Sequence, residues 1–155
     1  MLNPVLWIHG EALGPTNPAL VAYPGAPAVF VFDRQLIAQA GLSLKRLGFI
    51  YECLLELPLT LRHGDVAEEV LAFARRHRAD GVATSSAVDP RFAGLHQRIA
   101  AQLPVQLLEP EPFVELPEPV DLRRFSRYWR RAEPVLWGRR AGAGAPPAPV
   151  RRWDR

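Results

Sequence analysis

Two apolar runs near the N-terminus, Val5-Leu6-Trp7-Ile8 and Ala28-Val29-Phe30-Val31-Phe32-Asp33, decide the fold. They are joined by a segment that begins His9-Gly10-Glu11 and contains several turn-forming residues. Neither run alternates between apolar and polar residues, which is typical of strands buried on both faces of a sheet. Such strands pair in parallel, and the chain must then cross back along the face of the sheet. The opening of the chain therefore predicts an α/β domain.

Apolar runs and helical stripes continue to alternate along the chain. Strands are expected over residues 4–9, 28–32, 59–63, 81–85 and 105–108. Helices are expected over residues 43–57, 66–78 and 90–103, with a shorter one beginning near Arg34 and ending at Gly41. Because crossovers between parallel strands are right-handed, helices should cover both faces. The sequence predicts a Rossmann-like, doubly wound, five-stranded parallel sheet.

The helix boundaries are marked by capping residues. Ser43 precedes the first long helix, and Asp65 precedes the second with Glu68 three positions later, as in a capping box. Asp89 precedes the third, with Pro90 at its first position. In the helix over 43–57, one side is expected to carry the apolar residues Leu44, Leu47, Tyr51, Leu54 and Leu55.

The positive net charge of +3 is concentrated at the C-terminal end. Residues 1–120 carry nine Lys/Arg against thirteen Asp/Glu, residues 121–137 five against two, and residues 138–155 five against one. A nucleic-acid-binding domain spreads basic residues over a face of its fold. Direct, specific DNA binding is therefore not expected, although the arginine-rich end could attract phosphates or acidic partners weakly.

The chain is expected to divide into three parts. Residues 1–120 form the α/β domain, residues 121–137 an amphipathic segment, and residues 138–155 a disordered tail rich in Arg, Pro, Gly and Ala. No apolar run is long enough to span a membrane, and no secretory signal is visible. The lone Cys53 cannot form an internal disulfide. These features predict a cytoplasmic protein without a membrane partner.

Several motifs, in order along the chain, resemble the photolyase/cryptochrome family, in particular its N-terminal α/β domain, the antenna type. The first is the strand–loop–strand unit with Asn17-Pro18-Ala19-Leu20 before the second strand. The others are Leu44-Lys45-Arg46-Leu47-Gly48-Phe49-Ile50-Tyr51-Glu52-Cys53-Leu54, Leu61-Arg62-His63-Gly64-Asp65, Ala83-Thr84-Ser85-Ser86-Ala87-Val88-Asp89-Pro90 and Phe125-Ser126-Arg127-Tyr128-Trp129.

The resemblance implies the strand order 3-2-1-4-5 and a stand-alone N-terminal domain of DNA photolyase type. It implies a flavin or deazaflavin antenna chromophore as the candidate cofactor. The chain ends where that family's catalytic half would begin, so the FAD site is expected to be absent and the chain alone is not expected to be an enzyme. The expected partner is a separately encoded FAD-binding helical flavoprotein, docked through residues 122–137.

Ligands of doubly wound sheets bind beyond the carboxyl ends of the strands, where the strand order reverses. In the expected order, that crevice lies between the first and fourth strands. The candidate ligand-binding residues are His9, Gly10 and Glu11, facing Thr84, Ser85 and Ser86, with Asp33, Arg34 and Arg46 beside them. Some of them also have a purely structural interpretation: His9 as a loop histidine, Gly10 as a turn residue, Ser85 and Ser86 as strand-end serines and Asp33 as a helix cap.

No catalytic residue and no metal ligand is predicted. The chain lacks Gly-x-Gly-x-x-Gly after the first strand, a Gly-Lys-Ser/Thr phosphate loop and Gly-x-Ser-x-Gly. Its four histidines show no metal-ligand spacing. The favoured function is a photolyase-like module that binds a chromophore, a nucleotide or a partner. The alternatives are a degenerate scaffold with an empty crevice and, third, an enzyme acting on a nucleotide-like substrate.

Overall fold

The computed structural model describes residues 3–39, 41–116 and 120–138. Contacts between residues divide the chain into two units, Met1–Glu111 and Pro112–Arg155, which are described separately. The first unit contains the whole sheet. The predicted disordered tail over 138–155 lies, apart from Gly138, outside the described residues. The predicted three-part division of the chain therefore stays a prediction.

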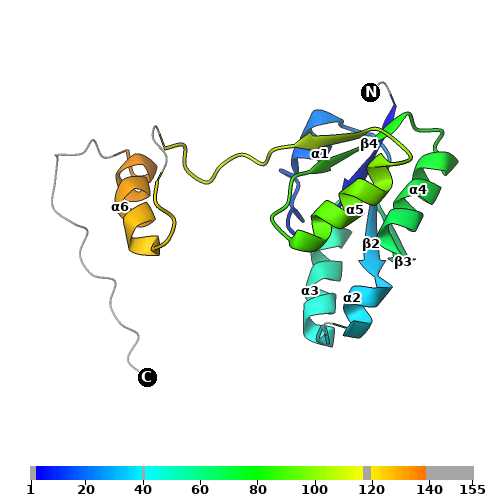
Figure 1. Cartoon of the computed structure of the whole chain (residues 1–155), viewed down its shortest axis with the longest axis horizontal. Helices are drawn as coiled ribbons and strands as arrows, with labels where there is room; N and C mark the ends of the chain where they lie inside the picture. The colour runs from blue at the N-terminus through cyan, green and yellow to red at the C-terminus, as the bar shows by residue number, and fades with distance from the viewer. Residues whose placement is uncertain (1–2, 40, 117–119, 139–155) are drawn as a thin grey trace. The chain divides into compact units, whose positions relative to one another are not determined.

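The first unit is built on five strands: β1 (Pro4–Ile8), β2 (Ala28–Asp33), β3 (Thr60–Gly64), β4 (Gly81–Ser85) and β5 (Val105–Leu108). All four pairings are parallel, and the strand order is β3-β2-β1-β4-β5 (Figure 1). In the central strand, Leu6 is in register with Ala28 of β2 on one side and Ala83 of β4 on the other. The predicted fold class and strand order are confirmed.

Five helices connect these strands: α1 (Pro18–Ala22), α2 (Arg34–Gln39), α3 (Leu44–Leu55), α4 (Val66–Arg76) and α5 (Pro90–Ala100). The predicted caps are present. The Ser43 side chain accepts a hydrogen bond from the Arg46 amide, Asp65 from the Glu68 amide and Asp89 from the Arg91 amide. Each cap satisfies an amide that the first helical turn leaves without an internal partner.

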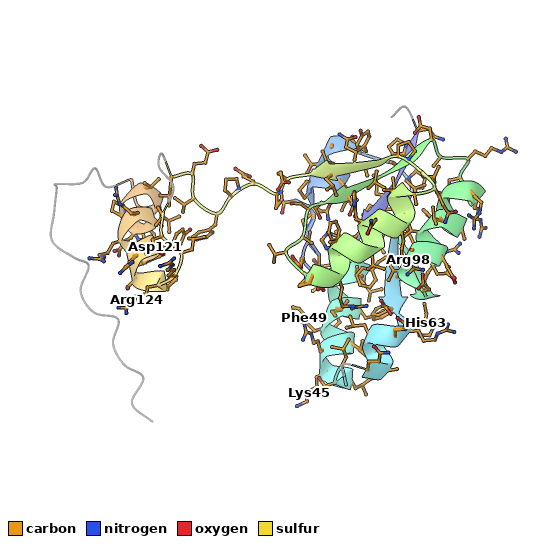
Figure 2. All side chains as sticks on the ribbon, viewed as in Figure 1. Lys45, Phe49, His63, Arg98, Asp121 and Arg124 are labelled. Atoms are coloured by element: carbon orange, nitrogen blue, oxygen red, sulfur yellow. The ribbon has the colours of Figure 1, made fainter. Side chains whose placement is uncertain are left out.

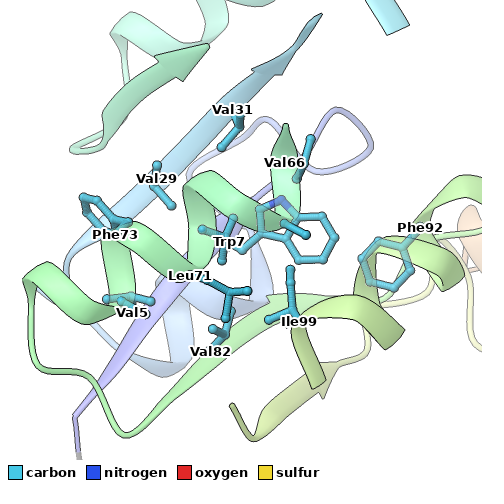
Figure 3. Packing of buried hydrophobic residues seen from close by; sticks show 13 residues of the cluster. Val5, Trp7, Val29, Val31, Val66, Leu71, Phe73, Val82, Phe92 and Ile99 are labelled. Atoms are coloured by element: carbon cyan, nitrogen blue, oxygen red, sulfur yellow. The ribbon is translucent and has the colours of Figure 1, made fainter. Parts of the chain in front are cut away.

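The two faces of the sheet pack against different helices, which explains why β1 and most of β2 are apolar along their length. Val5 and Trp7 of β1 belong to a core with α4 and α5 (Figure 3). Leu6 and Ile8 point to the opposite face and form a second core that contains Ala19 of α1 and Leu54 of α3. Successive strand residues point to opposite faces, so a strand covered on both sides needs an apolar residue at every position.

The orientation of α3 differs from the prediction. Its buried side carries Leu54, 1% exposed, with Leu47 and Ile50 half-buried, whereas Leu44 and Leu55 are 84% and 63% exposed. The sequence contains two neighbouring apolar stripes on this helix, and periodicity merged them into one face. Only one of them contacts the sheet.

The second unit contains α6 (Phe125–Leu136). The rings of Phe125 and Trp129, one turn apart, are stacked with centroids 5.8 Å apart. Ala132 is fully buried, while Val135 and Leu136 are exposed. Across all of the described residues, no helix combines the length and the apolar character needed to cross a lipid bilayer.

Candidate functional site

A cavity of about 270 Å³ opens at the carboxyl ends of β1 and β2. One wall comes from α2 and α3, through residues such as Leu36 and Leu47. The opposite wall comes from α5, through Phe92 and Leu95, and Val66 at the start of α4 also contributes. Figure 1 shows α2 and α3 beyond the end of β2, with α5 in front of the sheet. The cavity thus lies where ligands of doubly wound sheets are normally bound.

Aromatic residues form much of the inner surface. Trp7 and Phe92 stack nearly in parallel, with ring centroids 5.1 Å apart and an interplanar angle of 12°. Phe30 and Phe32 of β2 meet edge to face at 5.0 Å. All four residues are among those that line the cavity, and Trp7, Phe30 and Phe92 also belong to the buried cores, where they are 2%, 6% and 8% exposed. The inner part of the cavity is therefore largely aromatic.

His9 lies at the end of β1 and is held by Ser85 at the end of β4. The His9 Nε2 atom is 3.0 Å from the Ser85 carbonyl oxygen and 2.9 Å from its hydroxyl. A carbonyl can only accept, so Nε2 carries the proton and Nδ1 is free to accept from the Glu11 amide at 3.4 Å. Burial lowers the pKa of His9, although the Ser85 carbonyl and nearby carboxylates favour the charged form. His9 is therefore a neutral, oriented imidazole at neutral pH.

Glu11 closes the loop that follows β1 onto the loop that follows β4. Its two carboxylate oxygens accept hydrogen bonds from the Val88 and Asp89 amides, both at 3.0 Å. The loop residues after β4 are thereby drawn against those after β1. The cavity is lined by residues at the ends of β1 and β2 and also by Ala87 and Asp89 of the loop after β4. The expected ligand crevice between the first and fourth strands stays a prediction.

The three residues at the end of β4 are used inside the fold. The Thr84 hydroxyl donates to the Trp7 carbonyl oxygen at 2.7 Å, and Ser85 is fully buried beside His9. The Ser86 hydroxyl donates to the Glu109 carboxylate at 2.6 Å. None of the three is among the cavity-lining residues that the structure describes.

Charged groups surround the mouth of the cavity. Asp33 accepts from the Leu36 amide at 3.0 Å, which caps α2, and from Arg91 of α5 at 2.5 Å. Arg46 of α3 also lines the cavity, and among the described residues its guanidinium has no ion pair. Arg34 is exposed in the first turn of α2 and does not line the cavity.

The structure thus brings together five of the nine candidate residues, namely His9, Gly10, Glu11, Asp33 and Arg46. Arg34, Thr84, Ser85 and Ser86 lie outside the lining. Whether any of the nine contacts a ligand stays a prediction. The aromatic wall and Arg91 were not foreseen as parts of the site. Nothing in the sequence indicated that Arg91 would reach Asp33, which is 58 positions earlier.

The comparisons with known proteins show a similarity of fold and nothing more. No sequence model of a known family matches the chain, and no curated protein matches it. Among solved structures, the hypothetical protein PH0823 aligns with a TM-score of 0.47 and 12% identity, over 74% of this chain and 100% of that one. The hypothetical protein MJ0577 aligns with a TM-score of 0.41 and 10% identity, over 72% of this chain and 99% of that one. A universal stress protein in complex with cAMP aligns with a TM-score of 0.40 and 12% identity, over 69% of this chain and 94% of that one.

These findings correct the family assignment. Of the three structures named above, one is a universal stress protein and none is a photolyase or a cryptochrome, so the predicted photolyase/cryptochrome family and the main function built on it are wrong. The flavin or deazaflavin antenna was a candidate cofactor only and stays untested. The expected FAD-binding helical partner rested on the same resemblance, and none of these comparisons tests it.

The motifs misled because they are signals of local structure. Asn17 accepts hydrogen bonds from the amides of Ala19 and Leu20 and caps α1. Asp33, Asp65 and Asp89 cap α2, α4 and α5 in the same way. Strands that end in Asp or Asn before a helix are a general solution for doubly wound sheets.

Proposed function

We propose that the domain is a binding module whose cavity holds a nucleotide-like ligand: a flat heterocycle that carries an anionic group. The observation that carries this proposal is the combination, in one cavity at the carboxyl ends of β1 and β2, of stacked aromatic walls and the Arg46 guanidinium at the mouth. The heterocycle would lie against the rings, and the anionic group would lie at Arg46.

The size of the cavity narrows the ligand class. About 270 Å³ is slightly below the range of about 300–1,000 Å³ that is common for small-molecule sites. That space suits a single ring system with a short anionic arm, such as a mononucleotide, and is too small for a dinucleotide. The ligand would be bound and not transformed, because the three carboxylates that line the cavity, those of Glu11, Asp33 and Asp89, are already engaged by backbone amides or by the Arg91 side chain.

The same internal bonds favour the second candidate, a scaffold with no ligand. His9, Glu11 and Asp33 all make the hydrogen bonds that hold the loops together, and the scaffold needs no more than that. An enzyme acting on a nucleotide-like substrate has less support, since it would require an uncommitted acid or base. For location, we propose the cytoplasm, because the single cysteine provides no disulfide.

Calorimetric titration separates the candidates. AMP, cAMP, adenosine and ribose 5-phosphate are titrated separately into the full chain; cAMP is the ligand of the universal stress protein named above. Binding of the nucleotides, with weaker binding of adenosine and of ribose 5-phosphate, supports the proposal. Arg46→Gln should weaken nucleotide binding by the value of a charge-assisted hydrogen bond, about 1.5–3 kcal/mol, and leave adenosine unaffected. Arg76→Gln, on the exposed end of α4, is the matched control. Absence of binding by all four compounds favours the scaffold.

A further inference from the structure

A stripe of apolar residues on α3 has no partner within the described residues of the first unit. Leu44, Tyr51 and Leu55 are 84%, 47% and 63% exposed, and Gly48 lies between them, also exposed. Their spacing of four, three and four residues places them along one side of the helix. Scattered exposed apolar residues are ordinary, but a continuous stripe of them on one helix indicates a docking surface.

The spacing of the stripe, four, three and four residues, is the same when it is counted from either end of the helix. If a second α3 lies antiparallel to the first, Leu44 meets Leu55 of the other copy and Gly48 meets Tyr51. The space at Gly48 is open: a Cβ built there would meet no atom within 4 Å. The small residue of one helix thus faces the large ring of the other, and the two-fold symmetry makes this contact occur twice.

The charges beside the stripe are complementary under the same symmetry. Lys45 and Glu52 are seven residues apart, so they lie on the same flank of the helix, and neither takes part in the ion pairs of the described residues. Figure 2 shows Lys45 pointing outward from the end of α3. In an antiparallel pair, Lys45 of each copy lies beside Glu52 of the other. A parallel pair would place the two flanks on opposite sides and leave these charges without partners.

We propose that α3 is a self-association surface, through which two copies of this chain dock with their α3 helices antiparallel about a two-fold axis. This inference does not rest on the proposed ligand. The neighbouring side of α3 carries Arg46, Leu47 and Ile50, which line the cavity. A contact based on a helix of 12 residues, about 18 Å long, is small, so the dimer is weak and depends on protein concentration.

Sedimentation velocity of the full chain over a concentration series tests the charge arrangement. Lys45→Glu and Glu52→Lys should each weaken dimerisation, by on the order of tenfold, because like charges then face each other twice. An equimolar mixture of the two variants should restore association, since each variant carries the charges that complement the other. The double variant Lys45→Glu/Glu52→Lys should dimerise like the wild type.

Gly48→Gln tests the packing without a risk to folding. Glutamine favours a helix more than glycine does, so the thermal midpoint of the monomer should not fall, while the filled space should abolish dimerisation. Gly94→Gln is the matched control, since Gly94 lies in α5 and also has open space around its Cα. Phe49→Ser controls for loss of exposed apolar surface, because Phe49 is 64% exposed on a different side of α3 (Figure 2).

Three results would overturn the inference. The first is a chain that stays monomeric at every concentration tested. The second is a dimer that persists unchanged in Gly48→Gln and in both charge variants, which would place the contact on another surface. The third is a mixture of Lys45→Glu and Glu52→Lys that associates no better than either variant alone.

Discussion

Arg91 and Asp33, 58 positions apart in the sequence, are joined across the mouth of the cavity by a hydrogen-bonded ion pair of 2.5 Å. Asp33 ends β2 and caps α2, whereas Arg91 lies in the first turn of α5. One carboxylate therefore ties together the two walls between which the cavity opens. The first prediction concerns how much each of its two bonds contributes.

Removing Arg91 and removing Asp33 should have different effects on stability. Arg91→Met loses only the ion pair, whose arginine side chain is 41% exposed, so the free energy of unfolding should fall by less than about 1 kcal/mol. Asp33→Ala also loses the cap of α2, so its free energy of unfolding should fall by about 1 kcal/mol more than that of Arg91→Met. Asp33→Asn, which keeps an acceptor for the Leu36 amide, should resemble Arg91→Met. Urea unfolding measures all three, and equal losses for Asp33→Ala and Asp33→Asn would argue against the capping role.

The pair between Asp65 and Arg98 should contribute to stability in a pH-dependent way. The two terminal guanidinium nitrogens of Arg98, Nη1 and Nη2, donate to the Asp65 carboxylate at 3.0 and 2.8 Å, which links the start of α4 to α5. This hydrogen bonding, above all, lowers the pKa of Asp65 below its ordinary value of 3.8. The folded state therefore releases the proton more readily, so the stabilisation is complete above that value and is lost as the pH falls through the lowered pKa.

Unfolding experiments between pH 2 and 6 on the wild type and on Arg98→Met measure this contribution. The difference in unfolding free energy between the two proteins should be greatest near pH 6, within about 0.2–1 kcal/mol, and should shrink towards pH 2. Arg76→Met, an exposed arginine at the end of α4, is the control. A difference that stays constant across the range would mean that Arg98 acts through packing alone.

His9 should make the domain less stable in mild acid. Burial lowers its pKa below the ordinary value of 6.5, so the unfolded chain takes up a proton at a pH where the folded chain does not. Stability contributed by neutral His9 is therefore complete above about pH 6.5 and falls as the pH drops until the lowered pKa is reached.

His9→Gln removes this titration and keeps a donor near Ser85. Its unfolding free energy should vary less between pH 7 and pH 5 than that of the wild type. Because the other three histidines remain in both proteins, the difference between the two curves isolates His9. A wild type and variant with parallel curves would show that His9 has the same pKa in the folded and unfolded chains.

Leu54 and Leu55 offer a comparison of identical side chains in adjacent positions. Leu54 is 1% exposed and packs against the sheet, while Leu55 is 63% exposed on the outer side of α3. Leu54→Ala should lower the free energy of unfolding by about 2–5 kcal/mol through the lost burial and the cavity left behind. Leu55→Ala should change it by no more than about 0.5 kcal/mol. Thermal and urea unfolding give both values at low protein concentration, and equal losses would contradict the observed orientation of α3.

The sequence contained enough information to predict the sheet and the helix starts. Uninterrupted apolar runs identify strands covered on both faces, and Ser43, Asp65 and Asp89 each made the expected cap. These are local effects, carried by residues close together in the chain. They are also why the family was misjudged, since the same caps and runs serve many doubly wound sheets.

The cavity depended on contacts that sequence patterns do not reveal. On one side of the cavity, Glu11 binds backbone amides that are 77 and 78 positions away in the sequence. On the other side, Arg91 binds Asp33. Such bonds follow from the tertiary arrangement and leave no periodic signal. The orientation of α3 was ambiguous for a different reason: its two apolar stripes satisfy helical periodicity equally well, and only packing selects the one with Leu54.

The most direct test of the proposed binding module is the fluorescence of Trp7 during a titration with AMP. Trp7 lines the cavity, and it becomes the sole tryptophan of the full chain when Trp129, Trp137 and Trp153 are changed to phenylalanine. A base stacked in the cavity should quench its emission in a saturable way, and Arg46→Gln should shift the midpoint to higher AMP concentration. Emission that stays unchanged up to millimolar AMP, in a protein that unfolds cooperatively, would contradict the account.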